Sequence, residues 1–325
     1  MFAYALKRLL GSLPLLFLVS VLSFTLIKLA PGDALDTLRA NPAVSQQFIQ
    51  SEVDRLGLDR PPHEQYFIWL KNALQGDLGS SYTYQISAVS LVTQRAGNTL
   101  LMAISSFLFT WLLAIPLGIY GAVRQSSLAD KVLSFFSYFS QGFPSFVLCI
   151  GLLFLASVSG GFLPTGGMTS VNYAQLNPLQ QILDTAWHLI LPTLAIGLVG
   201  FAGLQRITRG NLLDVLREDY IRTARAKGLD ENRVIYVHAL RNSINTLITL
   251  LGFEFAGLLS GAFIAEFFFS WPGLGMLILE AFKSYDINVV MASLLLGTFM
   301  LVLGNLLADL LLKVADPRIR LEEAE

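Results

Sequence analysis

Six apolar runs dominate the 325-residue sequence and limit what it can fold into. They extend over residues 9–30, 99–123, 132–158, 188–204, 244–269 and 287–312, the fourth being the shortest. A helix needs about 20 apolar residues to cross roughly 30 Å of hydrocarbon. The polar residues inside the runs are mostly Ser, Thr, Gly, Asn and Gln, which a helix in lipid tolerates because its backbone is satisfied internally. The runs therefore predict an all-α integral membrane protein with six transmembrane helices.

The composition agrees with this fold class. Hydrophobic residues make up 54% of the chain and the mean hydropathy is +0.60, whereas soluble domains are about 45–50% apolar. The net charge of −1 averages the two sides of a membrane, so it indicates nothing about partners. Nucleic-acid binding has no support in the sequence.

The first run could be a secretory signal, because Lys7 and Arg8 precede it. It is 22 residues long, however, while the apolar part of a signal peptide has about 7–15 residues. The "LAPGD" that follows offers no small-x-small cleavage site. We therefore expect a retained transmembrane span.

The basic residues predict the orientation of the chain. With a cytoplasmic N-terminus and six alternating spans, fifteen of the 22 Lys and Arg residues lie on the inside and seven on the outside, although the outside loops are longer. Cytoplasmic loops carry the excess of Lys and Arg. Both termini are therefore predicted to be cytoplasmic.

Several classes of site have no motif here. The phosphate-binding G-x-x-x-x-G-K-[ST] loop is missing, so the chain is not expected to be an ATPase, and no G-x-S-x-G or H-E-x-x-H marks an enzyme. His63, His188 and His238 lie too far apart for a helical i, i+4 metal site. We expect no metal and no cofactor in this chain, and we interpret the lone Cys149 as a packing residue.

Three acidic residues fall within the apolar runs, where a carboxylate is costly. Glu254 is the deepest and is our candidate for the translocation pathway. Glu266 is expected near the outer interface. Asp309 is four residues from both Asn305 and Lys313, which favours an ion pair at the cytoplasmic interface.

Small residues at helix-packing spacing occur in two runs. Gly257 and Gly261 form a G-x-x-x-G, while Gly197, Gly200 and Gly203 follow each other at intervals of three. Such faces let helices approach closely, within one chain or between two.

The polar segment after the first run predicts an extracytoplasmic helical region, giving a division into residues 1–30, 31–97 and 98–325. A first amphipathic helix should end at Gly57, and a second should start at Pro61 and Pro62. The expected apolar positions are Phe48, Val53 and Leu56 in the first helix, and Tyr66, Trp69, Leu70 and Leu74 in the second. Later outside segments predict an interfacial helix ending at Trp187 and a short re-entrant or interfacial piece at 269–275.

The cytoplasmic loop at 206–243 contains a stretch, 219–242, with eight charged residues in twenty-four. Its pattern predicts a helix, a turn at Gly228, an N-cap at Asp230 and a second helix. The expected apolar stripes are Leu213, Leu216, Tyr220 and Ala224, then Val234, Val237, Leu240 and Ile244. The pattern fits a rigid contact for another protein, or a solvated loop that anchors the bundle by its positive charge.

Two motifs in this stretch carry a family resemblance. "RTARAKGL" at 222–229, followed by "HALRN" at 238–242, resembles the cytoplasmic EAA loop of ABC importer permeases, in the form typical of the dipeptide, oligopeptide and nickel permeases. Of the general EAA pattern only Ala224, Gly228 and Leu240 match. Further similarities lie at "LGLDRP", "QYFIWL", "GDLGSS", "FSWPGLG" and "DPRIR", the last at 316–320.

The resemblance implies a type I ABC importer permease of the bacterial inner membrane, one of two membrane subunits around a pathway for peptides or a similar small solute. Separate ATPase subunits would bind ATP and Mg²⁺, and an extracytoplasmic binding protein would deliver the solute. The loop would seat on an ATPase through a small Ala224, the turn at Gly228 and the charges of Arg222, Arg225 and Lys227. The residues implied in coupling are Arg222, Thr223, Ala224, Arg225, Ala226, Lys227, Gly228 and Leu229.

Two other classes stay open on sequence pattern. An ion-gradient-driven secondary transporter or channel should show inverted repeats and midplane carboxylates, and neither is clear here. A membrane scaffold without transport would have no need of a glycine-turned docking pair. Peptides, nickel complexes, opines and sugars all remain as substrates.

Overall fold

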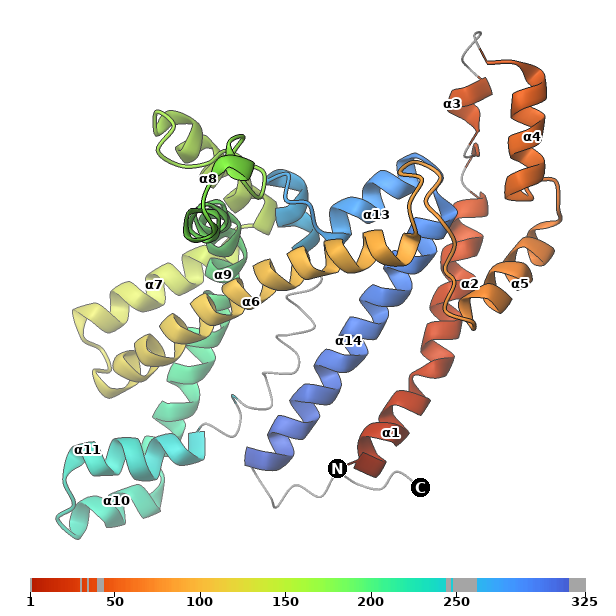
Figure 1. Cartoon of the computed structure of the whole chain (residues 1–325). Coiled ribbons are helices and arrows are strands. Elements are labelled where there is room, and N and C mark those ends of the chain that lie inside the picture. Colours follow the sequence, from red (N-terminus) through yellow and green to blue (C-terminus); the bar gives the residue numbers. More distant parts are fainter. Residues whose placement is uncertain are drawn as a thin grey trace. The chain divides into compact units, whose positions relative to one another are not determined.

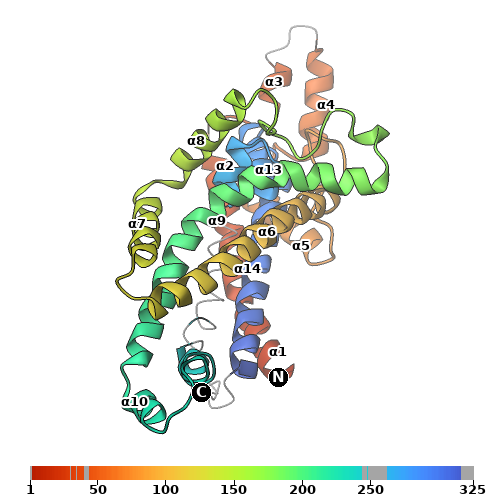
Figure 2. The ribbon, with the colours of Figure 1, turned by 90° about the vertical axis from the view of Figure 1, so that its left-hand side faces the viewer.

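The computed structural model describes residues 2–29, 31–33, 35–39, 44–243, 247 and 262–315. The chain divides into two compact units, one of Phe2–Thr99 with Pro272–Val302 and the other mainly of Leu100–Trp271 with Leu303–Glu325. Both are helical (Figures 1 and 2). The helices are α1 (Phe2–Gly11), α2 (Leu13–Leu29), α3 (Asp36–Arg39), α4 (Gln46–Leu56), α5 (Pro62–Ala73), α6 (Ala88–Val123), α7 (Leu128–Gly142), α8 (Ser145–Val158), η1 (Tyr173–Gln175), α9 (Pro178–Leu216), α10 (Asp219–Ala226), α11 (Glu231–Arg233), η2 (Val234–Ala239), α13 (Leu274–Lys283) and α14 (Ile287–Ala315).

In the described part of the chain, four helical stretches are long and apolar enough to cross a bilayer: Tyr4–Leu29, Ala88–Val123, Pro178–Leu216 and Ile287–Leu307. A fifth span results if α7 and α8 are counted together. The predicted fifth run, at 244–269, lies mostly outside the described residues, as do Glu254, the Gly257–Gly261 pair and the motif at 316–320. The count of six spans therefore stays a prediction.

The run at 132–158 was expected to form one helix, and this is wrong. The structure breaks it into α7 and α8, which are bent by 105°. Phe143 takes an extended conformation, with φ −97° and ψ 132°, before Pro144. A proline disfavours the helical conformation in the residue that precedes it, and it has no N–H to continue the helix.

The expected span at 188–204 is part of a much longer helix. α9 has 39 residues and begins with Asn177 as its N-cap, whose Oδ1 accepts from the Gln180 backbone N at 2.9 Å. It contains both the piece expected as a separate interfacial helix and the first part of the loop expected from residue 206. One unbroken helix therefore leads toward α10 (Figures 1 and 2).

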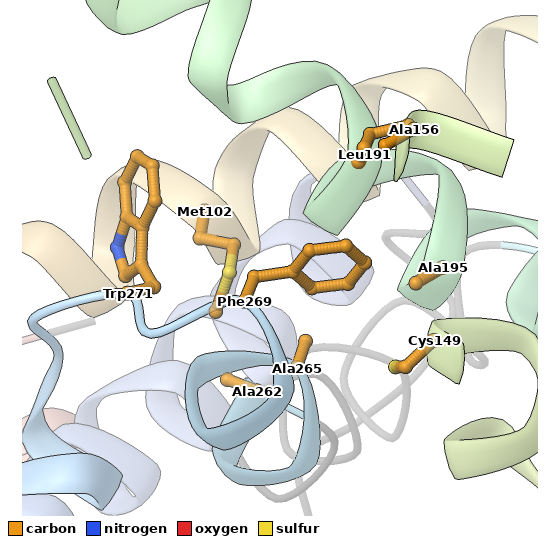
Figure 3. Close-up of a cluster of buried hydrophobic side chains, with 9 residues drawn as sticks. All are labelled: Met102, Cys149, Ala156, Leu191, Ala195, Ala262, Ala265, Phe269 and Trp271. Atoms are coloured by element: carbon orange, nitrogen blue, oxygen red, sulfur yellow. The ribbon is translucent and has the colours of Figure 1, made fainter. Parts of the chain in front are cut away.

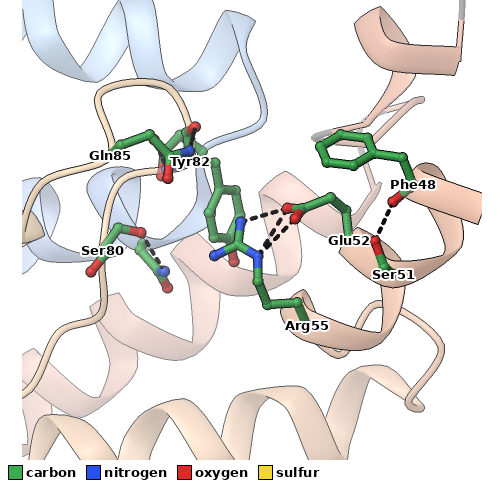
Figure 4. Close-up of polar contacts among 9 residues, drawn as sticks. Phe48, Ser51, Glu52, Arg55, Ser80, Tyr82 and Gln85 are labelled. Carbon is green, nitrogen blue, oxygen red and sulfur yellow. Dashed lines mark hydrogen bonds and ion pairs between the residues drawn. The ribbon is translucent and has the colours of Figure 1, made fainter. Parts of the chain in front are cut away.

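In the unit that contains the N-terminus, α4 ends as predicted at Gly57, which has φ +65°. Its buried residues are Ile49 and Val53, which pack against Leu35, whereas Phe48 is half exposed and not on the apolar face as expected. On α4, Arg55 makes an ion pair of 2.6 Å with Glu52 on the side toward Tyr82 (Figure 4).

The helix α5 packs as predicted through Tyr66 and Trp69, which join Phe24 and Met291 in one cluster. Leu74, expected on the same face, is the C-cap residue and is 81% exposed. In the same unit the buried carboxylate of Asp286 accepts from Ser81 Oγ at 2.6 Å and from the Tyr82 backbone N at 2.8 Å. This carboxylate fixes the loop before α6 to the start of α14.

The other unit has an apolar core where α8 and α9 meet the helical residues 262–268 (Figure 3). The cluster consists of Met102, Cys149, Ala156, Leu191, Ala195, Ala262, Ala265, Phe269 and Trp271. Cys149 is buried inside it, which confirms its interpretation as a packing residue. Trp271, expected in an interfacial piece, is also fully buried.

The glycine face of α9 packs against α6 in two of its three positions. A Cβ on Gly197 would lie 2.5 Å from Phe109 Cδ1, and one on Gly200 would lie 3.2 Å from the Thr110 side chain. Thr110 Oγ1 also donates to the Gly197 carbonyl at 3.1 Å. These glycines therefore serve packing within this chain.

Candidate functional site

The 219–242 segment folds as a helix, a glycine turn and a second helical stretch, as the sequence predicts. α9 ends at Leu216 and α10 begins at Asp219, so only Arg217 and Glu218 separate them. Gly228 ends α10 with φ +77°, a conformation that L side chains avoid and glycine adopts freely. The carboxylate of Asp230 then accepts from the Asn232 backbone N at 3.0 Å and caps the second stretch.

One face of the segment packs on its own chain. Ile221 and Ala224 of α10 are buried in a cluster with Leu212 of α9, Ala122 of α6, and Val234 and Ala239 of η2. Leu229 packs against the same cluster and is partly buried. The Asn242 side chain donates to Tyr220 Oη at 2.7 Å and ties the two arms together. The segment is therefore held to the ends of α6 and α9.

The buried residues of the segment differ from the predicted stripes for two reasons. The break at Arg217 and Glu218 starts a new helical phase, so Ile221 is buried where Tyr220 was expected. In the second arm, η2 is a π-helix in which each backbone bond spans five residues instead of four. Val234 and Ala239 therefore share a face, and Val237 is 51% exposed.

The opposite face of α10 is exposed and charged. Arg222, Thr223, Arg225, Ala226, Lys227 and Gly228 are all exposed. The segment holds five Lys and Arg against three Asp and Glu, a net charge of +2. Arg222 pairs with Asp219 at 3.2 Å, and Arg225 makes a two-pronged pair with Glu231 at 2.6 and 3.1 Å.

The Arg225–Glu231 pair bridges the turn between α10 and α11. Hydrogen bonding to the Glu231 carboxylate raises the pKa of Arg225, so this guanidinium stays charged. Both groups are exposed, so the pair contributes little to stability. The pair holds the Arg225 guanidinium against the Glu231 carboxylate on the exposed face.

The structure places the proposed coupling residues on two different faces. Ala224 and Leu229 face the interior of this chain, while the six residues named as exposed face away from it. The small size expected of Ala224 is thus required by packing against α9 and η2. Its expected contact with a partner groove is not available in this arrangement.

The structure also locates two of the three acidic residues in the apolar runs, Glu266 and Asp309. Glu266, expected to reach the outer interface, is fully buried in its unit. Asp309 lies on α14, but the side chain of Lys313 is outside the described part. Among the described residues, no group of three His, Cys, Asp or Glu side chains is arranged to hold a metal ion.

The chain matches two families along almost its whole length. Residues 114–321 match the binding-protein-dependent transport system inner membrane component family, and residues 1–103 match the N-terminal family of the same membrane components.

Curated relatives give the same assignment. The chain is 40% identical over 320 residues to the oligopeptide transport system permease protein AppB of Bacillus subtilis (strain 168), a match that covers 98% of this chain and 99% of the relative. It is 36% identical, with the same coverage, to the glutathione transport system permease protein GsiC of Escherichia coli (strain K12).

The fold is similar to a solved structure, the inward-facing MetNI methionine ABC transporter. The TM-score is 0.53 at 16% identity, with 70% of this chain and 96% of that chain covered. These matches support the permease interpretation and not an ion-gradient transporter. The chain belongs to the binding-protein-dependent family of ABC importer permeases, membrane subunits in systems whose ATP hydrolysis is carried by a separate subunit.

Proposed function

We propose that this chain is one of two permease subunits that together form the translocation pathway of an ABC importer for peptides or a similar small solute. The observation that carries the proposal is the end-to-end relation to a permease named for oligopeptides, at 40% identity over 98% of the chain. A relative named for glutathione, itself a small peptide, supports the same solute class.

The exposed face of α10 is the proposed contact for the ATPase. A short amphipathic helix with one face fixed to its own chain can place the other face in a groove of a partner. Arg222, Arg225 and Lys227 supply positive charge on that face, and Thr223 and Ala226 are small enough for close approach. Closure of two ATPase subunits would then move the 219–242 segment and switch access to the pathway by a rigid-body motion.

The proposed assembly has six spans in the inner membrane, with both termini in the cytoplasm. Residues 31–97 lie outside, where an extracytoplasmic binding protein delivers the solute. Fifteen of the 22 Lys and Arg residues fall on the inside in this topology, in support of it. A second, homologous permease completes the pathway, to which Glu254 is proposed to contribute.

Gly228 gives the sharpest test of coupling. Among the described residues, no heavy atom beyond its chain neighbours lies within 4 Å of a Cβ added there, so a substitution adds only backbone strain. With φ +77°, Gly228→Val should cost about 1–2 kcal/mol at the turn, because β-branched residues avoid this conformation. Asparagine tolerates it, which makes Gly228→Asn the matched control.

The measurement is ATP hydrolysis stimulated by the solute-loaded binding protein, together with uptake, in proteoliposomes that contain the complete transporter. We expect Gly228→Val to lower both by about tenfold and Gly228→Asn to retain most of each. Equal activity of Gly228→Val and wild type would contradict docking through this turn. Uptake by the permeases without ATPase subunits would contradict the proposed energy source.

The solute class is tested separately, by binding of labelled di- to pentapeptides to the cognate binding protein and by their uptake. Uptake of a labelled peptide supports the proposal if unlabelled peptides abolish that uptake. Binding of a nickel complex or a sugar, with no binding of any peptide, would contradict it.

A further inference from the structure

A buried polar cluster joins three helices of one unit close to where α9 leads into the 219–242 segment. Asp130 lies in the first turn of α7 with its side chain 4% exposed, and Arg209 of α9 lies opposite. Arg209 Nε donates to Asp130 Oδ1 at 2.6 Å, and Nη2 donates to Oδ2 at 2.8 Å. Such a two-pronged pair fixes direction as well as distance.

Two further contacts extend the cluster. Ser137, two turns along α7, donates to Gln205 Oε1 of α9 at 2.8 Å, and both residues are buried. The Ser126 backbone N, in the turn between α6 and α7, donates to Asp130 Oδ2 at 2.9 Å. Ser126 has φ +64°, which is uncommon for a residue with a side chain. The carboxylate thus holds a strained turn as well as a neighbouring helix.

Helix α6 packs closely against these side chains because its residue 121 is a glycine. A Cβ on Gly121 would lie 3.1 Å from Asp130 Oδ1, 3.5 Å from Arg209 Cδ and 3.7 Å from Gln205 Nε2. We call Asp130, Ser137, Gln205 and Arg209 the polar clamp. In both views α7 runs beside α9 (Figures 1 and 2).

The polar clamp adds α7 to the helices that are linked to the 219–242 segment. The cluster beneath α10 includes residues of α6, α9 and η2 but none of α7. Arg209 is seven residues before the end of α9, about 10 Å along the helix axis at 1.5 Å per residue. A displacement of the 219–242 segment therefore reaches α6 and α9 through apolar packing, and the clamp ties α7 to them.

We propose that Asp130 and Arg209, supported by Gln205 and Ser137, are positioning residues that make α7 follow the movement that an ATPase imposes on the 219–242 segment. The inference rests on the proposed function of that segment. Because α7 is the first half of the bent pair, the polar clamp determines whether this part of the membrane region moves with the coupling contact. Losing Arg209 would leave the buried Asp130 carboxylate without its counter-charge, and losing either partner would remove the ionic link between α7 and α9.

The first test compares Asp130→Asn and Arg209→Lys with wild type in the complete transporter, reconstituted in proteoliposomes and normalised to assembled complex. We expect solute uptake per ATP hydrolysed to fall by about tenfold, while stimulated ATP hydrolysis changes far less. The matched control is Asp214→Asn, which removes a carboxylate from the same helix, α9, at an exposed position outside the polar clamp and the 219–242 segment. It should leave the ratio of uptake to hydrolysis unchanged.

If the pair has a purely structural role, the substitutions should lower uptake and ATP hydrolysis by the same factor. If the pair has no role, they should change neither. Either result overturns the proposal. If these two variants do not assemble, Gly121→Ala decides, because its Cβ, 3.1 Å from the carboxylate, shifts the pair by a few tenths of an ångström without removing a charge. It should lower the same ratio by a smaller factor, and an unchanged ratio in an assembled Gly121→Ala complex overturns the proposal.

A second readout is the distance between α7 and α9 during the cycle, measured by electron spin resonance between labels on Lys131→Cys and Asp214→Cys, both exposed sites. The buried Cys149 serves as a silent background. The distance between the two labels should stay the same with and without ATP when the clamp is intact. In Asp130→Asn the distribution of distances should broaden. Binding of the ATPase and the Gly228 result test the proposed function itself, so its failure is distinguishable from failure of the clamp.

Discussion

Two alanines of α10, only two positions apart, face opposite sides of the helix. Ala224 is buried among Leu212, Val234 and Ala239, while Ala226 is exposed. A helix turns by about 100° per residue, so positions two apart lie nearly opposite each other. In the proposed contact a partner subunit would meet Thr223, Ala226 and Lys227, whereas Ala224 sets how closely α10 approaches α9.

The first prediction separates packing within the chain from docking. Ala224→Leu should lower the free energy of unfolding by about 1–3 kcal/mol, because extra methylene groups in a packed cluster displace their neighbours. Ala226→Leu, the matched control on the exposed face, should stay within about 0.5 kcal/mol. Thermal unfolding and limited proteolysis of the purified chain in detergent, with no ATPase present, measure both. Equal stability of the two variants would contradict the buried position of Ala224.

At the scale of helices, the sequence predicts where the apolar spans lie better than where the helices end. α9 continues past its apolar part through Gln205 and Arg206 to Leu216, because a helix satisfies its own backbone in water and in lipid alike. Hydropathy detects the edge of the apolar run and not the end of the helix. Pro144 indicates a break in the run at 132–158, but the length of the run favours a single span.

The sequence predicts the helix, the turn and the second helix of the candidate site, but it does not predict which of their side chains are buried. Gly228 and Asp230 mark the turn and the cap by local chemistry, and both are confirmed. The π-helix shifts the buried residues of the second arm, and a 3.6-residue period cannot show that shift. Asp130 and Arg209 are 79 positions apart in the chain, so only the packing of α7 on α9 brings them together.

The glycines of α9 give a prediction for a helix pair. Gly197→Ala should destabilise the chain by about 1–3 kcal/mol, because its Cβ would lie 2.5 Å from the Phe109 ring. Gly203→Ala meets no heavy atom within 4 Å among the described residues, and it should gain up to about 1 kcal/mol from helix propensity. Thermal unfolding in detergent compares the two. Destabilisation of Gly203→Ala alone would show that the α6 contact is placed wrongly.

Across the molecule, polar and apolar side chains are distributed as in a protein embedded in lipid. α2 buries Ser20 and Ser23 while it exposes Leu18, Leu22 and Leu26 by more than half. Ser20 Oγ and Tyr66 Oη share a hydrogen bond of 2.8 Å in the interior. A soluble helix would place these residues the other way round. The surface of α2 is thus suited to hydrocarbon.

The proposed topology predicts a sidedness that single cysteines can measure. Gln75→Cys, at an exposed position directly after α5 in the 31–97 region, should react with a membrane-impermeant maleimide in intact cells of a double-membrane bacterium whose outer membrane has been permeabilised. Asn232→Cys should react only after the inner membrane is opened, because the proposed topology assigns the 219–242 segment to the cytoplasm from its excess of Lys and Arg. Neither side chain makes a hydrogen bond among the described residues, and the buried Cys149 should stay unlabelled in both variants. Labelling of both new cysteines from the same side would contradict the topology, because residues 75 and 232 are separated by an odd number of predicted spans, the three at 99–123, 132–158 and 188–204.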